Sequence, residues 1–185
     1  MSGGHDHIEG TNKSIAILIA ILAACLAIAE TGAKGAQTDV LTEHVEASNL
    51  WGFFQAKTIR QSIVRTAAEE VEALYKGGAE MPAAVQAQLE SWRRTVARYD
   101  SEPDTKEGRK ELREGALGHA AKRDKARAAY HHFEYGSAAF QLAIVLASAA
   151  AVTSVPLLAV ASGVLGLLGA ALTAIGFLAP TAIHL

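Results

Sequence analysis

The amino-terminal residues His5, Asp6 and His7 form the first group whose types and spacing could bind a metal ion. Two imidazoles flank a carboxylate, and both kinds of side chain are metal ligands. Ligands in a flexible tail make a weak and unselective site, so we interpret this segment as a solvated tail and expect no metal. The single cysteine, Cys25, excludes a cysteine-rich zinc site and an internal disulfide bond.

Titratable side chains also mark the edges of two apolar stretches. Glu30 follows one stretch, and His131, His132 and Glu134 precede another. An ionisable group inside a membrane is a functional candidate, but a group at the edge of an apolar run serves more often as an interfacial or helix-capping residue. We therefore expect Glu30 to border its helix and the two histidines to snorkel toward the interface. The sequence contains no serine–histidine–aspartate order, phosphate loop or dinucleotide fingerprint, so we expect neither an enzyme nor a cofactor.

The most distinctive cluster of functional side chains lies in one short segment. Trp51, Phe53 and Phe54 are followed closely by Lys57 and Arg60. On a helix the three aromatic side chains cover more than one face, so a single core cannot bury them all. They could contact a protein partner or a second copy, or they could be shared between a helical core and an intersubunit contact. The two basic residues could bind an anion.

Composition limits the class of protein. The chain has 185 residues, of which 50% are hydrophobic and 19% charged, against about 25% charged in an ordinary soluble domain. No Asp, Glu, Lys or Arg follows Glu134. This segregation excludes a conventional soluble globular domain. The net charge of −2 argues against a protein that binds nucleic acid through its overall charge, so we expect no nucleic-acid partner.

The first apolar run extends from Ile15 to Ala29 without interruption. A membrane-spanning helix needs roughly 17–25 residues, so the expected span takes in flanking residues and covers 14–33. Residues 1–13 then form a flexible tail.

Two other interpretations of this run stay open. Residues 27–29 resemble a signal-peptidase site, and residues 22–25 resemble a lipoprotein box in which Cys25 would carry the lipid. The leader contains only one lysine, Lys13, and the apolar run continues past Cys25. Both observations favour a retained membrane anchor.

Two further apolar runs follow at residues 136–155 and 156–179. Together they are too long for one helix that crosses a bilayer. Pro156 separates them, and proline both ends a helix and favours extended backbone in the residue before it. The sequence therefore predicts a transmembrane hairpin with a tight turn, followed by a tail of residues 180–185.

Small residues recur on one face of each of these two spans. Helices in lipid associate through close backbone contact at such faces, within one chain or between copies. The residues that we expect to pack in this way are Ala139, Ala143, Ala147 and Ala151 in one span, and Ser162, Gly166 and Ala170 in the other.

The polar segment of residues 34–135 separates the first span from the second, and its pattern is helical. Helices are predicted over residues 37–76 and 82–99, with a break at Gly77–Gly78 and a third helix that begins near Asp104 or Thr105 and runs into the second span. Apolar or small residues recur in steps of three and four at Ala56, Ile59, Ile63, Ala67, Val71 and Leu74, and again at Val85, Leu89, Trp92, Val96 and Tyr99.

Basic residues gather just before the second span, at Lys122, Arg123, Lys125 and Arg127. Such a cluster is attracted to anionic lipid headgroups and favours the cytoplasmic side of a membrane. We therefore predict a lipid contact at these residues and a polar domain that lies in the cytoplasm. The acidic surplus of residues 30–105 offers the same charges an alternative partner within the chain.

Three features of the sequence occur together: the segment NKSIAILIAILAACLAIAE, the segment GAKGAQTDVLTEHVEASNLWGFFQAKTIRQSIVRTAAE, and a charged helical region followed by two apolar spans. With these features the chain resembles a bacterial membrane family, domain-of-unknown-function family 4337. The most specific part is EASNLWGFFQAKTIRQ, residues Glu46–Gln61. The resemblance implies a bacterial inner-membrane protein of unknown activity and supplies no catalytic residues.

These observations predict an all-α integral membrane protein with three transmembrane helices and a cytoplasmic helical hairpin or bundle. The function that fits best is a membrane-anchored scaffold that self-associates into a homo-oligomer and recruits a cytoplasmic protein partner. The alternative is an oligomeric small channel or transporter subunit, because a pore needs no charge in its walls.

Overall fold

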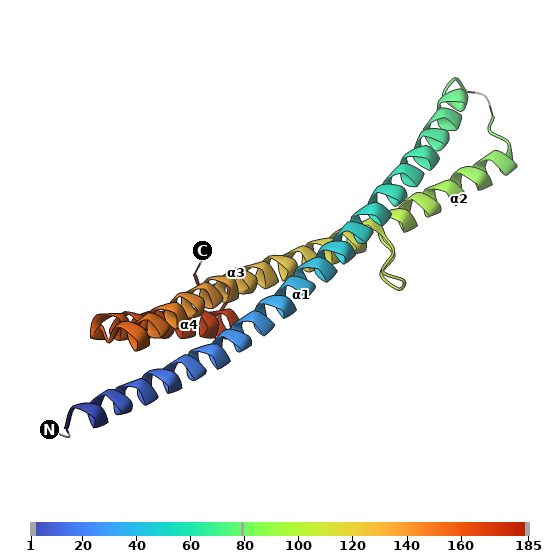
Figure 1. The fold of residues 1–185 in the computed structure, drawn as a ribbon. Coiled ribbons are helices and arrows are strands. Elements are labelled where there is room, and N and C mark those ends of the chain that lie inside the picture. Colours follow the sequence, from blue (N-terminus) through green and yellow to red (C-terminus); the bar gives the residue numbers. More distant parts are fainter. Residues whose placement is uncertain (1–2, 79, 184–185) are drawn as a thin grey trace. The chain divides into compact units, whose positions relative to one another are not determined.

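The chain is helical throughout the two ranges that this computed structural model describes, residues 3–78 and 80–183, apart from short connections. The predicted all-α class is confirmed. Four helices follow one another along the chain: α1 (Gly3–Tyr75), α2 (Ala83–Asp100), α3 (Arg109–Thr153) and α4 (Pro156–Leu178) (Figure 1). Side chains are described from Lys13 onward, so the interpretation of His5, Asp6 and His7 lies outside the described side chains.

Helix α1 is longer than either helix that the sequence predicts in this region. The expected span of residues 14–33 and the expected helix of residues 37–76 belong to one helix of 73 residues. The segment between them contains no proline, and the hydroxyls of Thr31 and Thr38 donate to carbonyl oxygens one turn earlier in the same helix, at 2.7 and 2.9 Å. Nothing local ends the helix there.

Helices α1, α3 and α4 each contain a segment that is long and apolar enough to cross a membrane. The predicted break at Pro156 is confirmed, because α3 ends at Thr153 and α4 begins at Pro156. Ser154 has a φ of 57° and Val155 is extended, as expected for the residue before a proline. Two residues therefore suffice to connect the helices.

Contacts divide the chain into two compact units. The apolar unit comprises Met1–Leu41 and Arg123–Leu185, and the polar unit comprises Thr42–Lys122. Helices α1 and α3 each contribute a segment to both units. Each unit is described below by itself.

The apolar unit is held together by small residues at its helix crossings. Ala143 of α3 is completely buried, and its carbonyl oxygen accepts a hydrogen bond of 2.7 Å from the hydroxyl of Ser162 in α4. Gly166 in α4 leaves room for Leu22 of α1, because a Cβ atom at Gly166 would lie 2.6 Å from Leu22 Cδ2. Close approach of this kind is the expected way for helices to associate when the surroundings are apolar.

A second set of small residues surrounds Phe133, which is 3% exposed. Cβ atoms at Gly32 of α1 and Gly176 of α4 would lie 3.0 and 2.8 Å from the Phe133 ring. The ring of Phe177 meets Phe133 edge-on, with 4.6 Å between centroids. One aromatic side chain of α3 thus fills the space that two glycines leave open.

In the polar unit, α2 runs back alongside the C-terminal part of α1 (Figure 1). The residues that the sequence predicts in steps of three and four along α2 form its inner face: Leu89 is 4% exposed, and Val85, Trp92, Val96 and Tyr99 are half-buried. The break at Gly77–Gly78 is confirmed, and Gly78 has a φ of 91°, which favours glycine. The start of α3 packs on an earlier part of α1, where a Cβ atom at Gly115 would lie 3.1 Å from Leu50 Cδ1.

The third helix begins later than the sequence predicts, at Arg109 instead of near Asp104 or Thr105. The preceding loop folds back on the first turn of α3, and the Glu111 carboxylate accepts hydrogen bonds from the Ser101 hydroxyl and the Glu102 amide. Gly108 is buried against the backbone of Ser101 and Glu102, and no Cβ atom would fit there. This close approach delays the start of the helix.

Gln61 connects the helices of the polar unit. Its side chain is 3% exposed, although glutamine is usually on the surface. The amide nitrogen donates to the Val96 carbonyl oxygen of α2 at 3.0 Å, and the amide oxygen accepts from the Arg109 guanidinium of α3 at 2.5 Å. Arg109 also donates to the Thr58 hydroxyl at 3.0 Å. All polar atoms of the Gln61 side chain therefore have partners on other helices.

Gln61→Leu is expected to lower the free energy of unfolding of the polar unit by about 1–3 kcal/mol, because Arg109 then lacks a buried acceptor. Both tryptophans, Trp51 and Trp92, lie in the polar unit, so tryptophan fluorescence during urea unfolding reports on this unit. Gln55→Leu, at an exposed glutamine of the same helix, is the control. Equal urea midpoints for the two variants would contradict the role given to Gln61.

Candidate functional sites

Two of the three clustered aromatic residues pack inside the polar unit. The rings of Trp51 and Phe54 meet edge-on with 5.4 Å between centroids, and both residues are half-buried. The guanidinium of Arg109 lies 5.1 Å from the centre of the Phe54 ring, close enough for a cation–π contact. Phe53 is different, because it is 64% exposed. Of the three aromatic residues, Phe53 is the one that is free to meet another molecule.

The two basic residues of the same segment do not converge. The Lys57 side chain is only 13% exposed, and its ammonium lies 3.7 Å from Glu102 and 3.6 Å from Glu107. The same ammonium lies 5.3 Å from the centre of the Tyr99 ring. Arg60 is exposed. Lys57 therefore serves contacts within the polar unit, and the structure does not bring the two cations together as an anion site.

Asp100 and Glu111 lie where α2 meets α3, and the pKa values of both carboxyl groups are lowered. A hydrogen bond from Lys110, whose ammonium lies 3.2 Å from Asp100, is the largest cause that holds the pKa of Asp100 below its usual range. The hydrogen bond from the Ser101 hydroxyl, at 2.5 Å, is the largest cause that lowers the pKa of Glu111. Both charged forms stabilise the connection between α2 and α3.

Helix α1 has a second apolar face in the polar unit, and this face is uncovered. Val45, Ile59 and Ile63 are 54%, 61% and 63% exposed. Their helix face contains seven uncharged residues in alternating steps of four and three, and all seven are exposed. We call this face the α1 seam; it consists of Val45, Asn49, Gly52, Ala56, Ile59, Ile63 and Thr66.

The packed face of α1 lies on the opposite side. It contains Ala47, Gln61 and Ala68, which are 4%, 3% and 7% exposed. Helix α2 and the start of α3 both use this side, through contacts such as those of Gln61 and Leu50. The recurrent apolar positions that the sequence shows at Ile59 and Ile63 therefore lie on the surface of the single chain.

The small-residue stripes of the apolar unit are mostly used within the chain. On α3, Ala139, Ala143 and Ala147 are buried and Ala151 is half-buried. On α4, Ser162 and Gly166 are buried, whereas Ala170 is exposed. Contacts with Leu22, Phe140 and the facing helices account for the buried members.

The four basic residues before the apolar end of α3 are mainly on the surface. Lys122, Lys125 and Arg127 are exposed, and Arg123 is half-buried and bonds to its neighbour Asp124 at 2.7 and 3.0 Å. On a helix, Arg127 lies about 12 Å and Lys122 about 20 Å before Tyr135, where the charge-free segment begins. The headgroup layer on one side of a bilayer is about 5–8 Å thick. All four backbone positions therefore lie beyond such a layer, and Arg127 is the nearest of them to it.

His132 does not lie at the surface, and the expectation that it snorkels is wrong. It is 1% exposed, and its Nε2 atom lies 3.1 Å from the carbonyl oxygens of both Pro180 and Ile183. Nε2 must therefore carry the hydrogen and donate to the segment after α4. His132 precedes Gly136, Ala139 and Ala143 in helical steps, so the buried stripe of α3 begins two turns earlier than the sequence analysis placed it.

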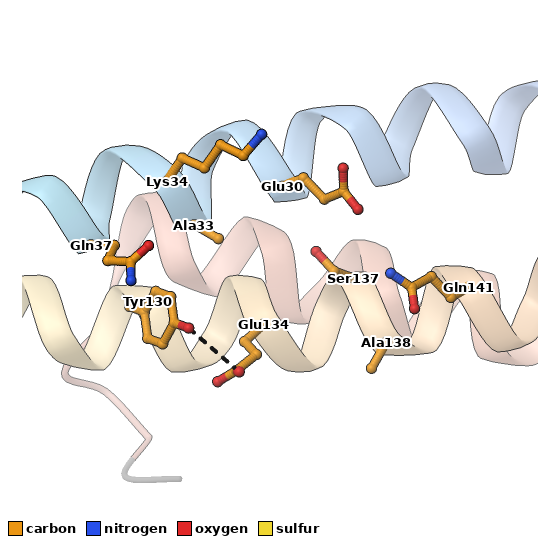
Figure 2. Close-up of a pocket in the computed structure, with 9 residues that line it drawn as sticks. All are labelled: Glu30, Ala33, Lys34, Gln37, Tyr130, Glu134, Ser137, Ala138 and Gln141. Carbon is orange, nitrogen blue, oxygen red and sulfur yellow. Dashed lines mark hydrogen bonds between the residues drawn. The ribbon is translucent and has the colours of Figure 1, made fainter.

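A polar cleft lies between α1 and α3 in the apolar unit (Figure 2). It has a volume of about 490 Å³. It lies where the charge-free parts of both helices end, because Glu30 follows the first apolar run and Glu134 is the last charged residue of the chain. The residues that line it are Glu30, Ala33, Lys34 and Gln37 from α1, and Tyr130, Glu134, Ser137, Ala138 and Gln141 from α3.

The polar groups of this interfacial cleft have few partners within the chain. The Tyr130 hydroxyl lies 3.5 Å from the Glu134 carboxylate, and the Nδ1 atom of His131 lies 3.7 Å from it. Ser137 is 8% exposed, and its buried hydroxyl has no hydrogen-bond partner among the described residues. No three or more His, Cys, Asp or Glu side chains of the described residues gather as a metal-binding group.

These features define a class of protein: an all-helical chain with three helices of membrane-spanning length and a polar helical unit that carries an exposed seam. The chain belongs to the family described as "Domain of unknown function (DUF4337)", whose model matches residues 11–179. The resemblance carried by Glu46–Gln61 is thereby confirmed. No curated protein and no solved structure matches the chain.

Proposed function

We propose that this protein is a membrane-anchored scaffold that self-associates through the α1 seam. In this proposal α1, α3 and α4 cross a bacterial inner membrane, and the polar unit lies in the cytoplasm. The observation that carries the proposal is the seam itself, in which seven exposed uncharged residues keep the four–three spacing of a coiled coil. A large apolar surface on a folded protein usually marks a contact with another protein.

A second copy of this chain is the occupant that fits the seam best. Copies that share a topology in one bilayer leave it at the same residue, so their α1 helices run in the same direction. Each seam residue then faces its counterpart. In parallel coiled coils a single polar Asn in the seam favours one register, and Asn49 occupies such a position.

The middle of the α1 seam favours close approach. Gly52 and Ala56 lie between Val45 on one side and Ile59 and Ile63 on the other. Among the described residues, nothing beyond the backbone of its own helical turn lies within 4 Å of where a Cβ atom would be at Gly52. Two helices can therefore approach closely at Gly52 while the larger side chains interlock beyond it. Phe53, at the edge of the seam, would extend the contact.

The seam covers about three heptads, the lower end of what defines a coiled coil. Two factors compensate for this length. The helix is already formed in each copy, so association costs little ordering entropy. Confinement to a membrane also raises the effective concentration of one copy around another.

Disulfide cross-linking tests the parallel register directly. In a Cys25→Ala background, Ala56→Cys is expected to form covalent dimers in native membranes, because seam counterparts lie within the roughly 7 Å between Cα atoms that a disulfide allows. Arg65→Cys, which lies on the other side of the same helix, is the matched control and is expected to remain monomeric. Equal cross-linking at the two positions would contradict the seam.

Charge introduced into the seam should dissociate the copies. Ile59→Lys with Ile63→Lys is expected to weaken association at least about 100-fold, because two buried isoleucines per copy become charged and mutually repelling. Native mass measurement in lipid nanodiscs gives the subunit number. Leu117→Lys, at a leucine of α3 that is 52% exposed, is the control.

The subunit number also separates scaffold from channel. A dimer that Ile59→Lys with Ile63→Lys converts to monomers supports the scaffold. A ring of five or more copies that the same substitutions leave intact would overturn it and favour the oligomeric channel. In the scaffold, Arg127 meets anionic headgroups through its long side chain, and the exposed Arg60 remains available for a cytoplasmic protein partner.

A further inference from the structure

We propose that the interfacial cleft between α1 and α3 binds an ethanolamine phosphodiester, the headgroup chemistry of phosphatidylethanolamine. The volume of about 490 Å³ lies within the range of about 300–1,000 Å³ that small-molecule sites occupy. The inference rests on the membrane location proposed above and is independent of self-association. No part of the α1 seam lines the cleft.

The charges of the cleft match both ends of this group. Glu30 and Glu134 supply two carboxylates, and Lys34 supplies one ammonium. Neither Glu30 nor Lys34 makes an ion pair within 4.0 Å among the described residues. Figure 2 shows the Glu134 carboxylate turned away from α1 toward Tyr130, so a primary ammonium would bind at Glu30 while its phosphate meets Lys34, through charge-assisted hydrogen bonds.

Ser137 supplies the second observation that points to a ligand. Its hydroxyl is buried in the wall of the cleft without a partner among the described residues, an arrangement that costs free energy unless a partner arrives. Figure 2 shows this hydroxyl on the side of α3 that faces α1, with Glu30 on the opposite wall. A primary ammonium has three N–H donors, which can serve the Ser137 hydroxyl and the Glu30 carboxylate.

The position of the cleft favours a headgroup over a metal ion or an acyl chain. The charge-free segment of α1 ends at Ala29, and that of α3 begins at Tyr135. Because the cleft lies at both of these boundaries, it is at the level where the phosphates and amines of lipids gather. Gln37 and Gln141 add amide donors and acceptors to the wall. A choline headgroup fits less well, because its quaternary ammonium has no N–H to donate.

The test uses the full chain in nanodiscs that contain equal amounts of phosphatidylethanolamine and phosphatidylcholine. Native mass spectrometry counts the lipids that stay bound after the disc is removed. The expected result is about tenfold preferential retention of phosphatidylethanolamine, lost in Glu30→Gln. Glu114→Gln, an exposed carboxylate of α3 outside the cleft, is the matched control and should keep the preference.

Ser137→Ala separates a binding role from a structural one. Because the hydroxyl has no partner within the described chain, this variant should be as stable as the wild type in discs of phosphatidylcholine alone. In discs with phosphatidylethanolamine it should retain this lipid several-fold less. Retention equal to that of the wild type would count against the assigned role of Ser137.

A soluble competitor identifies the source of the ligand. If glycerophosphoethanolamine displaces the bound lipid, the headgroup alone is recognised; if it does not, but the preference persists, the acyl chains are also required. Equal retention of the two lipids by the wild type would overturn the proposal. Failure of the chain to enter nanodiscs at all would instead refute the membrane location.

Discussion

Replacing Gly136 with leucine should force α3 away from α4. A Cβ atom at Gly136 would lie 2.6 Å from the Thr173 hydroxyl and 3.1 Å from the Gly169 carbonyl oxygen, and the carbonyl belongs to the backbone of α4. The Thr173 hydroxyl donates to that same carbonyl oxygen at 2.8 Å, so it cannot turn away without losing its bond. Overpacking usually costs about 1–3 kcal/mol, and we expect at least the upper value here.

The single cysteine provides the measurement. Cys25 is half-buried against the cluster of Leu22, Ala29, Phe140 and Ala143 in the apolar unit, so its reaction with maleimide speeds up when this unit opens. A loss of about 3 kcal/mol should speed labelling by up to about 100-fold. Gly163→Leu is the matched control, because no atom lies within 4 Å of the Cβ position at Gly163. Equally slow labelling of both variants would show that α4 accommodates the larger residue.

Phe133→Ala should destabilise the apolar unit by a comparable amount. Phe133 is 3% exposed and fills the space between Gly32 and Gly176, where glycines have no side chain to move into the cavity. Truncation of a buried phenylalanine costs about 3–5 kcal/mol in soluble cores, because the cavity collapses only in part. Labelling of Cys25 should again accelerate, by up to about 100-fold.

Phe177→Ala serves as the control for Phe133→Ala. It removes the same kind of ring from the same aromatic pair, but Phe177 is 58% exposed and can be replaced by solvent or lipid. We expect a much smaller change in labelling rate for this variant. If the two variants label alike, the aromatic contact matters and the glycine-lined space does not.

The helix boundaries could be predicted where local chemistry decides them. Pro156 separates α3 from α4, and Gly77–Gly78 ends α1. Both breaks follow from the backbone preferences of these residues and need no contact with the rest of the chain. The start of α3 is different. Gly108 lies against the backbone of Ser101 and Glu102, and only the folded loop reveals that this glycine is required there. The sequence pattern alone therefore predicts a start of α3 that is a few residues before the observed one.

The packing of α1 could not be predicted from its periodicity. The helix has apolar residues on two opposite faces in the polar unit, one around Gln61 and Ala68 and one around Ile59 and Ile63. Either face satisfies the helical pattern, and the contacts of α2 and α3 decide which one is buried. The buried face contains Gln61. Because glutamine is polar, a search for hydrophobic residues at helical spacing does not identify this face.

The sequence could identify the charged members of the interfacial cleft but not the cleft itself. Glu30 and Glu134 are separated by more than one hundred positions in the chain, and each is recognisable only as a residue at the edge of an apolar run. Their common cavity depends on the register between α1 and α3. Nothing in the sequence marks Ser137 as a binding residue, because serine is common in membrane helices. Its lack of a hydrogen-bond partner among the described residues is visible only in three dimensions.

The two-residue turn at Ser154 and Val155 also bears on how the protein is made. Its residues are uncharged, as is the whole chain after Glu134, so the tip of the hairpin can cross a bilayer without the cost of about 2.5–3.5 kcal/mol that a charged residue carries. Helices α3 and α4 can therefore enter as one preformed pair. In the proposed membrane location, the orientation of the whole protein would then be set by residues up to Glu134, which leave the ribosome first.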